Sequence, residues 1–239
     1  MHLVVCLGAS IMRGRFGTNF VELLSQRMSK DGFPFVNSGV NGDLAYNVLA
    51  RLDAVIARQP DYVVILVGTN DITAALYPRS ARMFLSRLTR RLPRPPSTEW
   101  YHDNMLQIVR LLKDKTTARI ALASLTVLGE DLTSLPNERV RVYNALLKEI
   151  TLQEQVTYLP VYERQEEYLS TAQHTKGRPF EPRGMLTLEL LVRHYLMWQS
   201  FDEISKKNGF LLVTDGIHMN SQGAAIIADQ IESFLRASE

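Results

Sequence analysis

Residues 62–67 read YVVILV, and residues 68–71, directly after them, read GTND. The first run is made almost entirely of β-branched and large apolar residues, without the polar alternation of a strand that faces water on one side. It therefore predicts a central strand of a parallel sheet that is covered on both faces. The polar residues Asn70 and Asp71 would then lie at the carboxyl end of that strand.

On both sides of this strand, apolar runs of strand length alternate with segments of helical period. The alternation is typical of a parallel sheet whose strands are connected by crossover helices. We predict strands at residues 2–7, 33–37, 62–67, 119–125 and 156–159, and helices at 18–30, 45–58, 79–92, 102–113, 137–150 and 221–235. The chain of 239 residues is long enough for one such α/β domain, and we expect a single domain over residues 1–239.

Residues 163–206 do not continue the alternation, and we expect them to form an insertion or lid-like segment of the same domain. Residues 174–184, HTKGRPFEPRG, are rich in glycine, proline and charge and predict a loop. The next stretch, MLTLELLVRHYLMWQSF at 185–201, predicts a helix with large apolar residues around most of its circumference. Such a helix would pack on the core, cover an active site, or offer a contact surface for a homo-oligomer.

The composition is that of a globular protein that does not bind nucleic acid. Hydrophobic residues make up 46% of the chain and charged residues 22%, and the formal net charge is only +2. No apolar run approaches the roughly 20 residues that a transmembrane helix needs. The opening MHLVVCLGAS lacks a basic region and a cleavage site, so we interpret it as a first strand and not as a signal peptide. Its Cys6 is the sole cysteine, which excludes an intrachain disulfide and permits the cytoplasmic location that we expect.

Residues 8–10, GAS, form the first of four loops that carry candidate chemistry. Ester cleavage requires a hydroxyl nucleophile, a base that a third group orients, and donors that face the developing oxyanion. In a parallel sheet such groups meet in the loops after the carboxyl ends of the strands. Gly8 permits a sharp turn, and Ser10 would begin a helix, where it can present its hydroxyl and donate its amide to an oxyanion. A single serine in such a turn is more often structural.

Two further loops follow the next predicted strands. Residues 37–43, NSGVNGD, contain glycines that let the backbone approach a ligand closely, although an ordinary turn has the same composition. After the central strand, Asn70 can donate its side-chain amide to an oxyanion, while Asp71 can cap the next helix. A structural cap is the alternative explanation for this pair.

Residues 215–218, DGIH, form the fourth loop and precede the last predicted helix. Histidine is the side chain whose unperturbed pKa, about 6.5, suits proton transfer near neutrality. Asp215 can fold back across Gly216 and accept a hydrogen bond from one ring nitrogen of His218, which would leave the other nitrogen to face Ser10. The other histidines of the chain have no comparable partner arrangement.

Together, the series GAS, NSGVNGD, GTND and DGIH, in this order, resembles the SGNH hydrolases, which are also called the GDSL esterase/lipase family. The four blocks span nearly the whole chain, and we expect each of them, 215–218 included, to follow a strand. The resemblance implies a flavodoxin-like three-layer α/β/α sandwich with a parallel sheet of about five strands. It also implies an enzyme that cleaves a small-molecule carboxylic ester, with no metal and no organic cofactor.

The resemblance assigns roles to individual residues. It implies that Ser10 is the nucleophile, that His218 is the general base and that Asp215 orients this base. It further implies that Gly42 and Asn70 form the oxyanion hole together with the Ser10 amide.

One position departs from the family signature, and other functions are compatible with the same residues. Ala9 stands where the Gly-Asp-Ser motif has an aspartate, which would normally help to connect neighbouring loops by hydrogen bonds. An acyltransferase or a carbohydrate deacetylase would use the same catalytic residues. A catalytically inactive flavodoxin-like binding module is the alternative from a different class, although the chain lacks the glycine-rich motifs of nucleotide sites. The lack of a G-x-S-x-G motif argues against an ordinary α/β-hydrolase.

Overall fold

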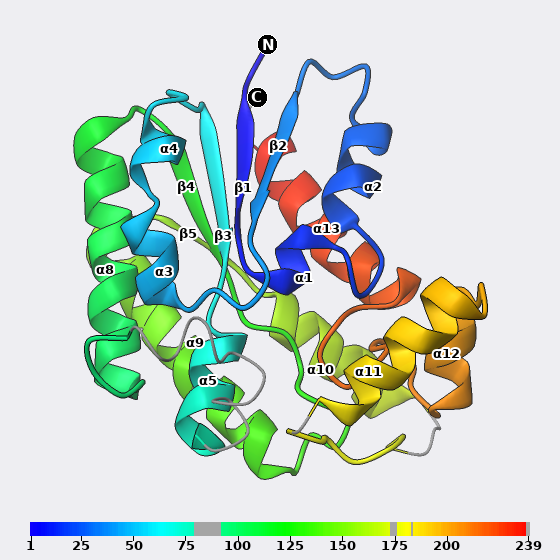
Figure 1. The fold of residues 1–239 in the computed structure, drawn as a ribbon. Helices are drawn as coiled ribbons and strands as arrows, with labels where there is room; N and C mark the ends of the chain where they lie inside the picture. Colours follow the sequence, from blue (N-terminus) through cyan, green and yellow to red (C-terminus); the bar gives the residue numbers. More distant parts are fainter. Residues whose placement is uncertain (79–91, 173–175, 183, 238–239) are drawn as a thin grey trace.

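The computed structural model describes residues 1–78, 92–172, 176–182 and 184–237 (Figure 1). Its centre is a sheet of five parallel strands in the order β2-β1-β3-β4-β5. The strands are β1 (Val4–Gly8), β2 (Phe35–Gly39), β3 (Tyr62–Leu66), β4 (Arg119–Ala123) and β5 (Thr157–Leu159). The predicted fold class is confirmed, and every strand overlaps its predicted range. All residues of β1 and β3 are buried, which explains why their sequences lack polar alternation.

Helices cover both faces of the sheet and form the outer layers of an α/β/α sandwich (Figure 1). One layer contains α2 (Phe20–Arg27), α10 (Val161–Thr171) and α13 (Ser221–Arg236), and α13 packs against the other two. The opposite layer contains α3 (Ala45–Ala50), α8 (Thr98–Lys115) and α9 (Leu135–Glu154), and α8 packs against the other two. The short helices α1 (Ser10–Arg13) and α5 (Thr69–Leu76) follow β1 and β3 directly.

The strand order places the candidate loops next to one another. Strand β1 lies between β2 and β3, and its last residue, Gly8, is in register with Gly39 of β2 and Leu66 of β3. In open parallel sheets, ligands bind beyond the carboxyl ends of the strands at the point where the strand order reverses. The first three predicted loops therefore converge at this point.

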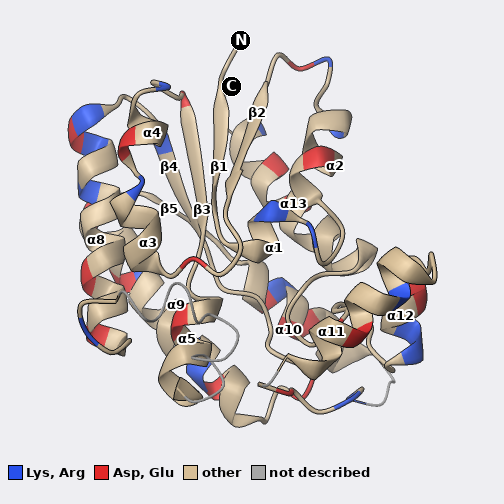
Figure 2. Cartoon of the chain, viewed as in Figure 1, with Lys and Arg blue, Asp and Glu red and all other residues tan. Residues whose placement is uncertain are grey.

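The surface carries charges of both signs, interspersed on the outer helices, whereas the sheet carries almost none (Figure 2). In the part of the chain that the structure describes, no helix combines the length and apolar character that a membrane crossing needs.

Two predicted helices differ from the observed elements or cannot be compared with them. Residues 45–58 form two short helices, α3 and α4 (Asp53–Ile56), since the backbone leaves the helical region at Arg51, where φ is −116°. The helix predicted at 79–92 lies, except for its last residue, outside the described residues.

The prediction of one continuous helix over 185–201 is wrong. Three elements take its place: α11 (Met185–Leu191), the π-helix η1 (Val192–Leu196) and α12 (Phe201–Lys207). The break coincides with Trp198, whose φ of +57° cannot continue a right-handed helix. Leu186 and Leu190 are buried, whereas Trp198 is 89% exposed.

Asp71, in the first turn of α5, connects this helix to α3 within the core. Asp71 was expected to cap its own helix, but its carboxyl oxygens accept the N–H of Ala45, the first residue of α3, at 3.3 and 3.2 Å. Burial raises the pKa of the Asp71 carboxyl to about 8, although the hydrogen bond from Ala45 opposes the shift. The carboxyl is therefore mostly protonated in the folded protein at neutral pH.

We predict that Asp71→Asn changes the pH dependence of stability, because asparagine can accept the Ala45 N–H but cannot ionise. Below about pH 4, the carboxyl is protonated in both the folded and the unfolded state. Between about pH 4 and pH 8 the unfolded chain gives up this proton more readily than the folded protein, so the wild type loses stability as the pH rises. The midpoint of thermal unfolding of the variant, relative to the wild type, should therefore rise from pH 5 to pH 8.

Asp229→Asn is the matched control, because the Asp229 side chain is 59% exposed and pairs with Arg27 at the surface. This substitution removes an exposed carboxyl and not a buried one. The difference between its midpoint of thermal unfolding and that of the wild type should therefore hardly change between pH 5 and pH 8. An equal pH dependence of the two variants would contradict the prediction.

Candidate active site

Ser10 is the first residue of α1 and lies just beyond the carboxyl end of β1. Its turn depends on Gly8, where β1 passes so close to β3 that a Cβ would overlap the carbonyl oxygen of Leu66. Gly39, at the end of β2, is constrained in the same way by the backbone nitrogen of Arg13 in α1. Glycine at these two positions lets the backbones approach closely enough to hold Ser10 at the edge of the sheet.

Ser10, His218 and Asp215 form an unbroken chain of hydrogen bonds, although Ser10 and His218 are 208 residues apart in sequence. The Nε2 atom of His218 lies 2.9 Å from Ser10 Oγ. Its Nδ1 atom lies 3.1 and 2.9 Å from the two carboxylate oxygens of Asp215. In this arrangement Nε2 can accept the hydroxyl proton of Ser10, while the Asp215 carboxylate accepts a hydrogen bond from Nδ1 and fixes the orientation of the ring. The structure thus brings all three predicted catalytic side chains together.

Asp215 is a buried carboxylate that the surrounding donors keep ionised. Burial by itself would raise its pKa, but the neighbouring His218 and the hydrogen bonds from His218 and Thr187 outweigh it and lower the pKa below its ordinary value. The hydroxyl of Thr187, on α11, donates to Asp215 at 2.6 Å. The backbone N–H groups of Ile217 and His218 donate at 3.1 and 2.9 Å. These bonds fix the carboxylate that orients the imidazole.

A second buried carboxylate, Glu130, holds the segment that leads into this turn. It accepts the backbone N–H groups of residues 211–213 at 2.7 to 3.1 Å. The neighbouring Gly129 N–H donates to the carbonyl oxygen of Gly216 at 2.7 Å. The loop after β4 therefore positions the turn that carries Asp215 and His218.

Three of the four predicted loops follow strands, whereas the expectation that 215–218 also follows a strand is wrong for the described residues. An isolated antiparallel bridge between Val213 and Met219 joins the two ends of this loop. Within it, the Thr214 N–H donates to the His218 carbonyl oxygen at 2.7 Å. The loop thus closes on itself, and its contacts with the loop after β4 replace support from a strand.

Gly42 lies in the loop beyond β2, and Asn70 lies in the first turn of α5, beyond β3. Strands β2 and β3 are the two neighbours of β1, the strand that precedes Ser10. The Asn70 side-chain amide donates one proton to the Asp43 carbonyl oxygen at 2.9 Å, which fixes the side chain and leaves its second proton available. Among the described residues, none accepts a hydrogen bond from the backbone N–H of Ser10 or of Gly42. An oxyanion needs donors of this kind.

Several residues around the site had not been predicted. The Phe16 ring packs edge-on against the His218 ring, with centroids 5.0 Å apart. Phe180 lies next to Gly216, and its ring centroid is 6.0 Å from that of Tyr77. Aromatic rings and the polar groups Thr187 and Glu130 therefore surround the turn. Glu130 could have been predicted, because it follows a predicted strand at the same edge of the sheet. Nothing in the apolar pattern around Thr187 indicates that Thr187 would bind Asp215.

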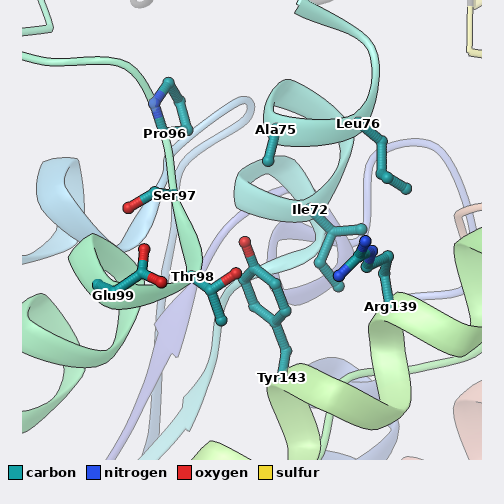
Figure 3. A pocket seen from close by; sticks show the side chains of 9 residues that line it. All are labelled: Ile72, Ala75, Leu76, Pro96, Ser97, Thr98, Glu99, Arg139 and Tyr143. Carbon is teal, nitrogen blue, oxygen red and sulfur yellow. The ribbon is translucent and has the colours of Figure 1, made fainter.

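One crevice in the described part of the structure lies apart from the predicted site residues. A crevice of about 280 Å³ lies between α5, residues 96–99 and α9 (Figure 3). Its lining consists of Ile72, Ala75, Leu76, Pro96, Ser97, Thr98, Glu99, Arg139 and Tyr143, and so includes none of the predicted site residues. Within the described ranges, no group of three or more His, Cys, Asp or Glu side chains is arranged to hold a metal ion.

Solved structures with a similar fold include several esterases. LAE5, an alpha/beta hydrolase enzyme from the metagenome of Lake Arreo in Spain, is 18% identical, with coverage of 97% of this chain and 94% of its own and a TM-score of 0.67. Axe2, an acetylxylan esterase from Geobacillus stearothermophilus, is 18% identical, with coverage of 97% and 93% and a TM-score of 0.66. AlAXEase, an acetyl xylan esterase, is 16% identical, with coverage of 97% and 98% and a TM-score of 0.65. A comparison with curated proteins found no match.

The structural similarity shows a shared fold, and a family model identifies the family. The model of the GDSL-like lipase/acylhydrolase family matches residues 6–226, a range that contains all four loops described above. The chain therefore belongs to the GDSL-like lipase/acylhydrolase family of serine ester hydrolases.

Proposed function

We propose that this ester hydrolase works through an acyl-enzyme on Ser10. The observation that carries the proposal is the 2.9 Å contact between His218 Nε2 and Ser10 Oγ. As Ser10 Oγ attacks the ester carbonyl, His218 takes the hydroxyl proton at Nε2, and Asp215 stabilises the imidazolium through Nδ1–H. His218 then gives this proton to the leaving alcohol. Water, activated in turn by His218, hydrolyses the acyl-enzyme.

The oxyanion of each tetrahedral intermediate is bound by the backbone N–H groups of Ser10 and Gly42 and by the side-chain amide of Asn70. The available donors of these groups support this role. Donors that are fixed before the reaction stabilise the developing charge without reorganisation at the moment of attack.

We also propose that, within the segment 163–206, the parts around Phe180 and Thr187 form one wall of the substrate site, and that residues 1–239 form a single domain. Residues 163–171 of this segment belong to α10 and so to the outer helix layer. The hydrogen bond from Thr187 to Asp215 and the position of Phe180 next to Gly216 support this assignment. The segment leaves large apolar side chains exposed, and these are Met185, Leu188, Val192, Tyr195, Leu196, Met197 and Trp198. A homo-oligomer through this surface stays a prediction, as does the cytoplasmic location.

A second candidate function is the removal of acetyl groups from a carbohydrate. Two of the similar structures are acetylxylan esterases, which supports this candidate. A lipase, in contrast, would need room for a long acyl chain beside the nucleophile.

We predict that Ser10→Ala abolishes ester turnover. Loss of the nucleophile should lower kcat by about 10⁴-fold or more, because only binding and oxyanion stabilisation remain. The burst of nitrophenol from p-nitrophenyl acetate should disappear as well. Ser221→Ala is the matched control, since Ser221 is the exposed first residue of another helix, α13, and should keep wild-type kinetics. A burst of normal amplitude from Ser10→Ala would show that the nucleophile is a different residue.

We predict that Asn70→Ala impairs turnover more than substrate binding. Removal of one oxyanion donor costs about 10²–10³ in kcat, with KM little changed. Asn47→Ala is the control for disturbance of the neighbouring loop, because its side chain accepts the Leu44 N–H at 3.0 Å but faces no proposed oxyanion. An increase in KM at constant kcat would contradict the oxyanion role of Asn70.

We predict a preference for short acyl groups, which tests the second candidate function. Nitrophenyl acetate, butyrate and octanoate share one leaving group, so their relative kcat/KM values report the acyl site. The value for acetate should exceed that for octanoate by about tenfold or more if the acyl site cannot bury the longer chain. The opposite order would favour a lipase.

A further inference from the structure

Arg51, at the end of α3, extends its guanidinium to three separate segments of the chain. Its Nε donates to Asp43 Oδ2 at 2.7 Å, and Nη1 donates to Ser38 Oγ at 3.2 Å. Its Nη2 donates to the carbonyl oxygens of Gly8 and Ser38, both at 3.0 Å. The Arg51 side chain is 25% exposed and the Asp43 side chain 4%, so water screens this ion pair only weakly.

The segments that Arg51 joins carry the groups of the proposed oxyanion site. Gly8 lies two residues before Ser10. Asp43 directly follows Gly42, and its carbonyl oxygen accepts the Asn70 side chain. One guanidinium therefore links the turn of the nucleophile to the loop that holds the other donors. Its planar fork of donors suits this task, whereas the single ammonium of a lysine cannot make the same set of bonds.

Ala9, between Gly8 and Ser10, does not connect the turn of the nucleophile to the neighbouring loops through its side chain. Ala9 is apolar and 6% exposed, so its side chain contributes no hydrogen bond to a neighbouring loop. The carbonyl oxygen of Gly8 instead accepts from two sides, from the Val40 N–H at 3.1 Å and from Arg51 at 3.0 Å. Both donors belong to the chain between the end of β2 and the end of α3.

We propose that Arg51 is a positioning residue, which holds the Gly42 amide and the Asn70 side chain at the distance from Ser10 that oxyanion binding requires. The inference rests on the proposed function, because it gives Arg51 a role in that same site.

The charge of Asp43 explains why the loop depends on this contact. Burial raises the pKa of the Asp43 carboxyl, and Arg51 opposes the rise through a hydrogen bond and its positive charge. Without Arg51, Asp43 is a buried carboxylate that lacks its cation, which is strongly unfavourable. Asp43 then takes up a proton or moves toward water, and in either case it loses the ion pair that fixes its position next to Gly42.

The test compares Arg51→Met with the wild type and separates the number of working sites from the rate at each site. Titration with a phosphonate ester to completion counts the sites whose Ser10 reacts. Steady-state hydrolysis of p-nitrophenyl acetate, well below the unfolding midpoint, then gives kcat per titrated site. The proposal predicts a fall in kcat per titrated site of about 10²-fold, the effect of losing one oxyanion donor, with little change in KM. Fewer titrated sites with the wild-type kcat per site would show a purely structural role and overturn the proposal.

Two further variants complete the experiment. Arg110→Met is the matched control, because Arg110 also donates through Nε to a carboxylate, Glu154, at 2.8 Å, but this pair lies between α8 and the end of α9. It should leave kcat per titrated site unchanged. Arg51→Lys keeps the positive charge beside Asp43 but loses the fork, so kcat per titrated site should fall by about tenfold. This variant keeps the proposal testable if Arg51→Met does not fold, and a wild-type rate per site would overturn it.

The outcomes distinguish this inference from the proposed function. A wild-type protein that neither hydrolyses the ester nor reacts with the phosphonate would refute the proposed function itself. A wild-type protein that does both, together with Arg51 variants of equal kcat per titrated site, would leave the proposed function intact and reject the positioning role.

Discussion

The hydrogen bond between His218 and Ser10 joins two segments that are 208 residues apart, and much of the structure serves to make this contact. The sheet supplies one partner, because β1 ends directly before the turn of Ser10. The other partner lies on a loop without a strand of its own. Contacts from Glu130 and Gly129 attach this loop to the end of β4, so that both partners depend on the same edge of the same sheet.

The loops at this edge are held together by hydrogen bonds to buried carboxyl groups, whereas the sheet beneath them is held by apolar packing. The carboxylates of Asp43, Glu130 and Asp215 are all nearly inaccessible to water. Each has donors that fit its position: a guanidinium for Asp43, backbone amides for Glu130, and an imidazole with a hydroxyl for Asp215. A buried carboxylate is costly away from its donors, so each loop is restricted to one low-energy arrangement. Such restriction is what a preorganised oxyanion site requires.

The sequence predicted the sheet and the meeting of the first three loops, because both follow from local pattern and topology, whereas the place of loop 215–218 was implied by the family resemblance. Strands buried on both faces have no polar alternation, and parallel strands bring their carboxyl ends to one edge. Contacts of long side chains were not predictable in this way. Arg51 falls within the helix predicted at 45–58, where an arginine is expected to face solvent, and nothing in the sequence pattern identifies its loop partners. The break at Trp198 was missed because apolar periodicity carries no information about the φ angle of one residue.

The close backbone contacts at Gly8 and Gly39 also bear on how relatives of this protein can be recognised. A Cβ at either position would overlap a backbone atom of a neighbouring segment, and a backbone atom cannot rotate away as a side chain can. Position 9, between Gly8 and Ser10, is not restricted in this manner, since Ala9 occupies it without a polar side-chain contact. A search that demands the aspartate of Gly-Asp-Ser would discard this chain. The pair of glycines at the ends of adjacent strands is a requirement of the backbone geometry in this chain, so a search that keeps the glycines and leaves the aspartate position open would retain it.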